Sequence, residues 1–238
     1  MNQREIAQNL IIISLGGSLI VPDQINVAFM KEFKEVIEEE LKQGKYFIII
    51  TGGGKLSRRY VEAADKITAI DNEEKDWLGI HATRMNAHFV KTIFKKWAHP
   101  RINKNPRTRA DLWQHFRQGE KIMVAAGWRP GWSTDYVAVI LAERFQAKKM
   151  VNLSNITYVY DKDPNKFQDA QPIEKINWQE FRQLVGNRWD PGMNTPFDPI
   201  AAQLAEKNQM EVAIIGGQDL SNLKNYFQQS QFKGTIIN

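Results

Sequence analysis

Two glycine-rich segments follow short apolar runs and are well suited to hold an anion. Residues 16–18 (GGS) follow the apolar run 10–13, and residues 52–55 (GGGK) follow the run 47–50. Glycine reaches positive φ and lets backbone N–H groups approach a ligand without a Cβ in the way. Successive N–H groups in front of a helix N-terminus bind phosphate, and Arg58 would add positive charge. We therefore predict two phosphate sites; two tight turns without a ligand are the alternative.

Two further loops carry side chains suited to nucleotide binding. Residues 127–135 (GWRPGWSTD) end in Asp135 at an expected helix start. Asp135 would either complement the helix dipole, or orient a phosphate site and help to hold Mg²⁺. Residues 152–164 (NLSNITYVYDKDP) combine tyrosines, an amide and carboxylates, which fits an adenine and ribose pocket or a hairpin turn. The sequence has neither GxxxxGK[ST] nor GxGxxG, so the standard nucleotide fingerprints are absent.

The elements that position these loops alternate along the chain. Apolar runs predict strands at 10–14, 46–51, 121–126, 149–153, 211–215 and 234–237. Helical spacing predicts helices between them, including a long one with an apolar face at every fourth residue from Trp77 to Trp97. We expect helix caps at Ser133 or Thr134, at Asn177 and at Asp198. This βαβα order predicts an α/β fold, a three-layer α/β/α sandwich with a largely parallel central sheet and ligand sites at the carboxyl ends of its strands.

Composition limits the class of protein. The chain has 238 residues, which we interpret as one domain, 1–238, with softer lobes 1–150 and 151–238. It has no cysteine, no apolar run long enough to span a membrane and a polar start, so we expect a cytoplasmic protein. The net charge of +5 includes a basic stretch at 91–109. We interpret that stretch as a solvated helix end and loop with its aromatics in the core, rather than a nucleic-acid site.

The order of these motifs resembles the amino acid kinase superfamily, and within it the UMP kinases of the archaeal type. The residues that carry the resemblance run through nearly the whole chain: GGS, GGGK with an arginine, DWLGIHATRMNA, GWRPGWSTD, SNITYVYDKDP, DPIAAQLAE and GTII. The resemblance implies transfer of the γ-phosphoryl group of Mg·ATP to UMP, in a homo-oligomer that is usually a hexamer. Mg²⁺ would be held through the ATP phosphates, with no direct side-chain ligand assigned.

The resemblance also implies roles for particular residues. Those expected in catalysis are Gly17, Ser18, Lys55 and Asp135. Those expected to bind the acceptor are Gly52, Gly53, Gly54, Arg58, Asp76, Gly79, Thr83, Ser133 and Thr134. Those expected to bind ATP are Gly16, Gly17, Asn155, Tyr160, Lys162 and Asp163.

Several positions depart from the family pattern and leave alternatives open. Many members carry a lysine where Ser14 stands, so Lys55, Lys162 and Arg58, in that order, are candidates for the missing cation. Large residues in 127–135 and 189–197 could change the acceptor, for example to isopentenyl phosphate, for which some members use a histidine. His81 lies in the corresponding helix, but we expect it to pack in the apolar face. A non-catalytic anion or nucleotide storage or sensor protein is the third hypothesis.

Overall fold

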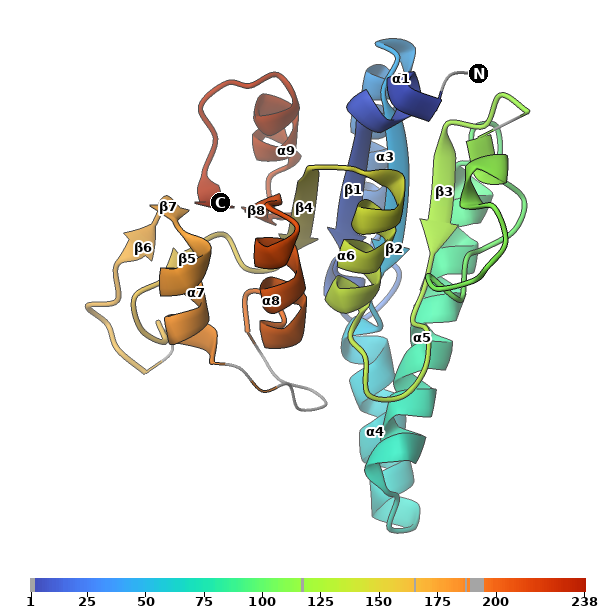
Figure 1. The fold of residues 1–238 in the computed structure, drawn as a ribbon. Coiled ribbons are helices and arrows are strands. Elements are labelled where there is room, and N and C mark those ends of the chain that lie inside the picture. Colours follow the sequence, from blue (N-terminus) through green and yellow to red (C-terminus); the bar gives the residue numbers. More distant parts are fainter. Residues whose placement is uncertain (1–2, 117, 165, 187, 189–194) are drawn as a thin grey trace.

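A seven-stranded sheet forms the centre of the molecule in the computed structural model, which describes residues 3–116, 118–164, 166–186, 188 and 195–238 (Figure 1). The strand order is β3-β2-β1-β4-β8-β9-β7. The strands are β1 Leu10–Leu15, β2 Tyr46–Thr51, β3 Ile122–Ala125, β4 Lys149–Ser154, β7 Lys175–Ile176, β8 Glu211–Gly216 and β9 Gly234–Ile237. The first five strands in this order pair in parallel, whereas β9 runs antiparallel to β8. The largely parallel sheet predicted from the alternating elements is thus confirmed.

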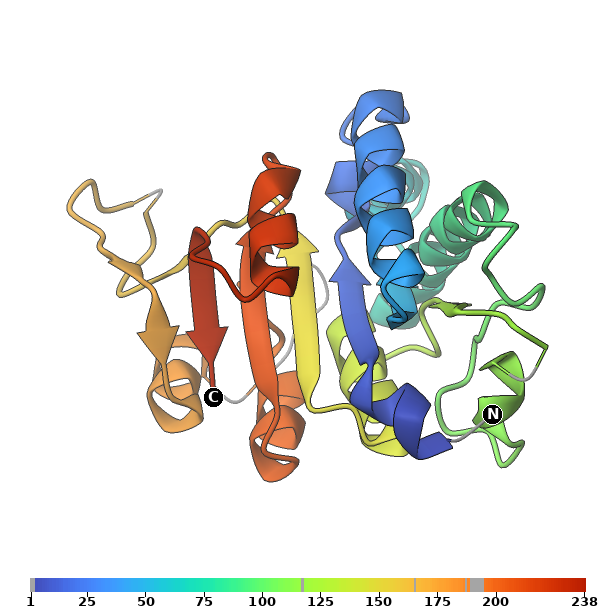
Figure 2. The same cartoon turned by 90° about the horizontal axis from the view of Figure 1, so that it is seen from above.

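Helices cover both faces of this sheet, which makes three layers (Figure 2). One face carries α1 Gln3–Gln8, the 3₁₀ helix η1 Leu112–Phe116, α6 Thr134–Phe145, α7 Trp178–Val185 and α8 Pro199–Lys207. The other face carries α2 Gly17–Ile20, α3 Val27–Lys42, α5 Asn72–Ile93 and α9 Leu220–Phe227. A separate two-stranded sheet pairs β5 Val159–Tyr160 with β6 Pro172–Ile173.

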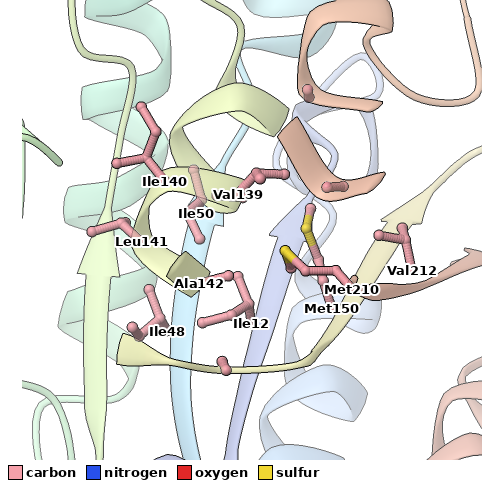
Figure 3. Packing of buried hydrophobic residues seen from close by; sticks show 14 of the residues in the cluster. Ile12, Ile48, Ile50, Val139, Ile140, Leu141, Ala142, Met150, Met210 and Val212 are labelled. Carbon is pink, nitrogen blue, oxygen red and sulfur yellow. The ribbon is translucent and has the colours of Figure 1, made fainter. Parts of the chain in front are cut away.

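Alternation along the strands builds the two cores. Ile12, Ile48 and Ile50 face α6, where they meet Val139 and Ala142 (Figure 3). Their neighbours in sequence point to the opposite face and pack under the helices there. A parallel strand buried on both faces needs apolar side chains at successive positions. This explains why the sequence shows continuous apolar runs rather than alternating ones.

The predicted helix caps are confirmed. The side chain of Ser133 accepts a hydrogen bond from the Tyr136 N–H at 3.1 Å. Asn177 caps α7 in the same way at 2.8 Å, and Asp198 caps α8 at 2.7 Å. Each cap satisfies one N–H group that a helix start leaves without a partner. The three caps therefore fix where α6, α7 and α8 begin.

Helix α5 differs from its predicted orientation. His81 is exposed, and Met85 is 67% exposed, although both belong to the expected apolar face. The buried face is instead formed by residues such as Ile80, Ala87 and Val90. The prediction that His81 packs in the core was therefore wrong.

Helix α4, Gly54–Ile67, packs along α5, and the two extend together beyond the carboxyl ends of the strands (Figure 1). None of the described residues of α4 is buried. Tyr60 and Ile67 are 60% and 85% exposed, so this hairpin presents apolar side chains to its surroundings. None of the helices in the described residues is long and apolar enough to cross a membrane.

Candidate functional site

A cavity of about 340 Å³ lies at the carboxyl ends of β1, β2 and β4. Three helices begin at its edge: α2 at Gly17, α4 at Gly54 and α6 at Thr134. The first residues of these helices line the cavity. The N–H groups in the first turn of a helix lack intrahelical partners and give the helix start a partial positive charge. The arrangement is suited to bind anionic groups from more than one side.

The two glycine corners contact each other through their backbones. A Cβ on Gly17 would lie 2.6 Å from the Gly54 nitrogen, and a Cβ on Gly54 would lie 2.8 Å from the Gly17 oxygen. Gly54 also has a φ of +60°, a conformation that other residues rarely adopt. Both residues must therefore be glycine for the two loops to approach this closely. The contact holds the starts of α2 and α4 side by side.

Asp135, in the first turn of α6, is linked to two elements far away in sequence. The hydroxyl of Ser14 on β1 donates a hydrogen bond to Asp135 Oδ1 at 2.8 Å. The backbone N–H of Asp198 donates to Asp135 Oδ2 at 3.3 Å. The carboxylate is thus fixed between the end of β1 and the start of α8. Ser14 occupies the position where many family members carry lysine.

Burial and a neighbouring acid act on the same carboxyl group. Burial raises the pKa of Asp135 to about 6, and the nearby Asp198 carboxyl adds to the rise, whereas the Ser14 hydrogen bond opposes it. Burial also raises the pKa of Asp198. With a pKa near 6, Asp135 is ionised at neutral pH and gains a proton in mild acid. Its charge therefore changes just below the physiological range.

Polar side chains of α5 position the surrounding loops. Asn86 Nδ2 donates a hydrogen bond to the Gly52 carbonyl at 2.8 Å. The hydroxyl of Thr83 accepts a hydrogen bond from the Gly127 N–H at 2.8 Å, and the Thr51 hydroxyl donates to the Thr83 carbonyl at 2.9 Å. The helix therefore joins the second glycine corner to the loop that precedes α6.

Aromatic and arginine side chains fill that loop. Trp132 lines the cavity and stacks on Tyr136, with ring centroids 4.1 Å apart. The Arg129 guanidinium lies 4.3 Å from the centre of the Trp128 ring. Arg107, from the basic stretch 91–109, donates a hydrogen bond to the Tyr136 hydroxyl at 2.9 Å. Trp132 is thus the aromatic side chain of this loop that lines the cavity, and Tyr136 packs against its ring.

Asp76 on α5 contacts the loop that precedes α6. Its carboxylate accepts a hydrogen bond from the Gly131 N–H at 2.7 Å. Burial raises the pKa of Asp76, and the Gly131 hydrogen bond opposes this rise. A partly buried carboxylate at the cavity edge is suited to accept hydrogen bonds from a hydroxyl-bearing ligand.

The structure brings most of the expected site residues to this one cavity. Those that line it are Gly16, Gly17, Ser18, Gly52, Gly53, Gly54, Arg58, Asp76, Gly79, Thr83, Ser133, Thr134, Asp135 and Asn155. Lys55 does not line it and lies 3.5 Å from Asp23; Lys162 pairs with Asp169 at 2.6 Å. Tyr160 and Asp163 also lie outside the cavity lining. Of the three candidate cations, Arg58 is the one that lines the cavity within the described part of the chain.

Some residues of the site did not stand out in the sequence. Asn152 on β4 lines the cavity and donates a hydrogen bond to the Pro196 carbonyl at 3.0 Å. Ser14 and Asp198 contact Asp135 from opposite ends of the chain. The sequence marks Asp198 as a helix cap and Ser14 as a departure from the family pattern, but it carries no signal for their contacts with Asp135, which depend on strand register and long-range packing. Residues 189–194 of the stretch 189–197, noted above for its large residues, lie outside the described residues.

The donor set around the cavity fits Mg²⁺ brought in by a phosphate ligand. The described residues include no cluster of three or more His, Cys, Asp or Glu side chains that could hold a metal. Mg²⁺ in phosphoryl-transfer sites needs only one or two carboxylates, because water and substrate phosphates complete its octahedron. Asp135, ionised at neutral pH and lining the cavity, would supply such a carboxylate.

Comparison with known proteins agrees with the fold and gives the family of the chain. The model of the amino acid kinase family matches residues 9–216, and the chain belongs to that family. A uridylate kinase from Pyrococcus abyssi is 35% identical over 95% of this chain and 98% of its own length. One from Thermoplasma volcanium is 33% identical over 92% of each chain. The crystal structure of uridylate kinase from Archaeoglobus fulgidus superposes with a TM-score of 0.75 at 26% identity, over 96% of this chain and 99% of that one.

Proposed function

We propose that the protein transfers the γ-phosphoryl group of ATP to UMP, giving UDP and ADP, in cytoplasmic pyrimidine nucleotide biosynthesis. The observation that carries the proposal is the meeting of three helix starts around Asp135 in one cavity. Two anionic phosphates must approach each other during this reaction, and backbone N–H groups on several sides would stabilise them together. The relatives named uridylate kinase, which match nearly the full chain, support UMP as the acceptor.

Within this proposal the two ends of the cavity bind different substrates. The second glycine corner, Arg58 and the start of α6 would hold the phosphate of UMP, and Asp76, Gly79 and Thr83 its sugar. The first glycine corner would face the transferred phosphoryl group, and Asn155 with Tyr160, Lys162 and Asp163 would bind the nucleoside of ATP. In this division residues 1–150 would bind the acceptor and, through the first glycine corner, the transferred phosphoryl group, whereas residues 151–238 would bind the nucleoside of ATP.

The chemistry requires positioning and charge compensation rather than a covalent nucleophile. A phosphate oxygen of UMP attacks the γ-phosphorus while the bond from that phosphorus to the bridging oxygen of ADP breaks. The attacking oxygen is already ionised at neutral pH, so no base has to remove a proton from it. Helix-terminal N–H groups and Arg58 would hold the phosphates in line. Ser14 and the Asp198 N–H fix the Asp135 carboxylate by hydrogen bonds. Asp135 would then organise the cations that lie between the two phosphates.

Magnesium would accompany ATP and neutralise charge on the phosphates during transfer. In its presence Asp135 would contact the hydrated ion. Arg58 would supply part of the positive charge that the family lysine supplies elsewhere, because its guanidinium lines the cavity, 3.3 Å from the Ser18 hydroxyl.

A homo-oligomer, with a hexamer expected from the family resemblance, belongs to the same proposal. The α4–α5 hairpin presents Tyr60, Ile67 and Met85, each at least 60% exposed. A monomer rarely exposes several large apolar side chains on neighbouring helices, whereas a subunit contact buries them. We infer that this hairpin packs against another copy of the chain.

The test of the function is ADP release with Mg·ATP and a panel of acceptors: UMP, CMP, AMP, dTMP and isopentenyl phosphate. We expect turnover with UMP, and its loss in Asp135→Asn. Glu35→Gln, an exposed change on α3, is the matched control and should retain activity. Turnover with another acceptor alone would replace UMP in the proposal. Nucleotide binding without turnover on any acceptor would contradict a kinase and support a storage or sensor protein.

A further inference from the structure

A second, larger cavity lies at the opposite end of β1 from the transfer site. Its volume is about 840 Å³, and it is formed by α1, the first residues of β1, the turn between α6 and β4, and the end of α9. Leu10 and Ile11 of β1 line this cavity, whereas Ser14 and Leu15 line the transfer site. The volume is in the range of pockets that bind small molecules. The proposed kinase reaction makes no use of it.

The charges that line this cavity all have one sign. Arg4, Lys45, Lys148 and Lys149 line it, and no Asp or Glu among the described residues does. Lys45 pairs with Glu40 outside the cavity, and Lys149 lies 3.8 Å from Glu211. Lys148 donates a hydrogen bond to the Asn208 carbonyl, which is neutral. The lining therefore keeps an excess of positive charge that would attract an anion.

Two amide side chains at the cavity are attached to backbone in an unusual conformation. Gln146 follows α6 and Gln229 lies just beyond α9, each with a φ of 56°. Glycine is the residue that ordinarily occupies such a left-handed position after a helix. A larger residue in this conformation costs free energy, and such residues occur more often at functional sites than elsewhere. Both glutamines line the cavity and carry amide N–H₂ groups that donate hydrogen bonds.

A third residue of the same kind provides a comparison. Gln209 follows α8 with a φ of 52°, but it does not line the cavity. Replacement by glycine relieves the same backbone conformation at all three positions. An effect on ligand binding at Gln146 and Gln229, but not at Gln209, would separate the role of the side chain from that of the backbone.

We propose that this cavity binds a small anion with two or more negative charges, at a site separate from phosphoryl transfer. Arg4 comes from α1, Lys45 from the turn before β2, and Lys148 and Lys149 from the start of β4. Lys45 is held by Glu40 and by the Phe227 carbonyl, so the contacts to a ligand rest first on Lys148 and Lys149, and the other two cations add positive charge around the same space. Gln146 and Gln229 donate hydrogen bonds to its oxygens. Phosphates and carboxylates both offer this chemistry.

The binding test uses calorimetric titration of the full chain with inorganic tripolyphosphate and, separately, with citrate, both without metal. Tripolyphosphate should also enter the transfer site, so the number of sites is the readout. We expect Lys148→Gln with Lys149→Gln to remove one site, and Arg58→Gln to remove or weaken the other. The lysine variant should still transfer phosphate to UMP. Binding of only one probe would show whether the cavity prefers phosphate or carboxylate groups. Binding of both would show that the cavity accepts small polyanions of either kind.

An unchanged number of sites in the lysine variant, or no binding of either probe to the unaltered protein, would overturn the proposal. The glutamine variants test it a second time. Gln146→Gly and Gln229→Gly should raise Tm but lower the affinity of the probe for this site several-fold. Gln209→Gly should raise Tm and leave that affinity unchanged. Equal affinity in all three glycine variants would contradict the role of the amides.

Discussion

The buried environment of Asp135 favours the protonated form of its carboxyl group more than water does. Because burial raises its pKa to about 6, the ionised carboxylate needed to organise cations is lost in mild acid. We predict that kcat/KM for the proposed reaction falls about tenfold per pH unit below pH 6. The measurement is the pH profile of ADP release at limiting UMP. A flat profile down to pH 5 would show that this carboxylate is not required in its ionised form.

The same group makes stability depend on pH. Its folded-state pKa lies above the ordinary value of 3.8, so its stabilising contribution is complete below about pH 4 and is lost as pH rises through about 6. Asparagine does not ionise, so Asp135→Asn removes this loss of stability at higher pH. Relative to the unaltered protein, the variant should gain on the order of 1–3 kcal/mol in the free energy of unfolding between pH 4.5 and pH 7. Urea unfolding at both pH values measures this gain, with Glu35→Gln as the variant that should show none.

Ser14 on β1 lowers the pKa of the Asp135 carboxyl group through its hydrogen bond. The hydroxyl stabilises the ionised form, so Ser14→Ala should raise the pKa of Asp135 further and move the acid limb of the activity profile to higher pH. Ser14→Thr keeps a hydroxyl and should restore the original profile. A uniform loss of activity in Ser14→Ala at every pH, with the limb unmoved, would assign Ser14 to packing alone.

Trp132 lines the cavity beside the start of α6, where we propose that the acceptor binds. Its ring lines the cavity and stacks on Tyr136, so Trp132→Ala would widen the site and remove stacking worth roughly 1 kcal/mol. We expect KM for UMP to rise about fivefold with a smaller change in kcat, and turnover with AMP to become measurable. Trp97→Phe, outside the cavity lining, should leave the ratio of UMP to AMP turnover unchanged. An unchanged ratio in Trp132→Ala would remove this residue from acceptor selection.

At the scale of elements, the two glycine corners depend on each other. Gly17→Ala would place a methyl group against the Gly53–Gly54 backbone and should destabilise the fold by about 2 kcal/mol or more. Gly79→Ala is the comparison, because a Cβ there meets only the Ser57 hydroxyl at 3.2 Å. It lies inside α5, where alanine favours the helix by up to about 1 kcal/mol. Denaturant unfolding should therefore give opposite signs, and equal effects would contradict the close loop contact.

Elements and caps were predictable because their signals are local. Apolar runs mark the buried strands, and Ser133, Asn177 and Asp198 each cap the helix that follows. The meeting of the glycine corners was also predictable, since parallel strands end at one edge. The hydrogen bond from Ser14 to Asp135 could not be predicted, because it joins residues 121 positions apart and depends on the packing of α6 against the sheet.

The error on α5 has a geometric cause. Residues four apart in a helix are displaced by about 40° around its axis, so a series with a step of four winds from one face to another. Trp77 and Ile93, the last residue of α5, are four such steps apart, which amounts to a displacement of about 160° around the axis. His81 and Met85 therefore point outward even though Val90 on the same helix is buried. A pattern of alternating steps of three and four would have identified the buried face.

At the scale of the whole molecule, the α4–α5 hairpin determines assembly in our proposal. Replacing Tyr60 and Ile67 by lysine introduces charge on a surface that we expect to be buried between copies. Light scattering after gel filtration should then show a smaller particle than the unaltered protein. Phe167→Lys, 49% exposed on a different part of the chain, should leave the mass unchanged. A monomer in every case would contradict the inferred contact.

Backbone contact between Gly17 and Gly54 also affects how such an enzyme can diverge. The separation of the two ligand loops is set by main-chain atoms, so it is inherited unchanged when side chains around the cavity mutate. In our proposal, substitutions around the cavity, such as one at Trp132, would change which acceptor binds without moving the two loops. Descendants of one ancestral sequence can therefore explore new substrates while their catalytic step is preserved.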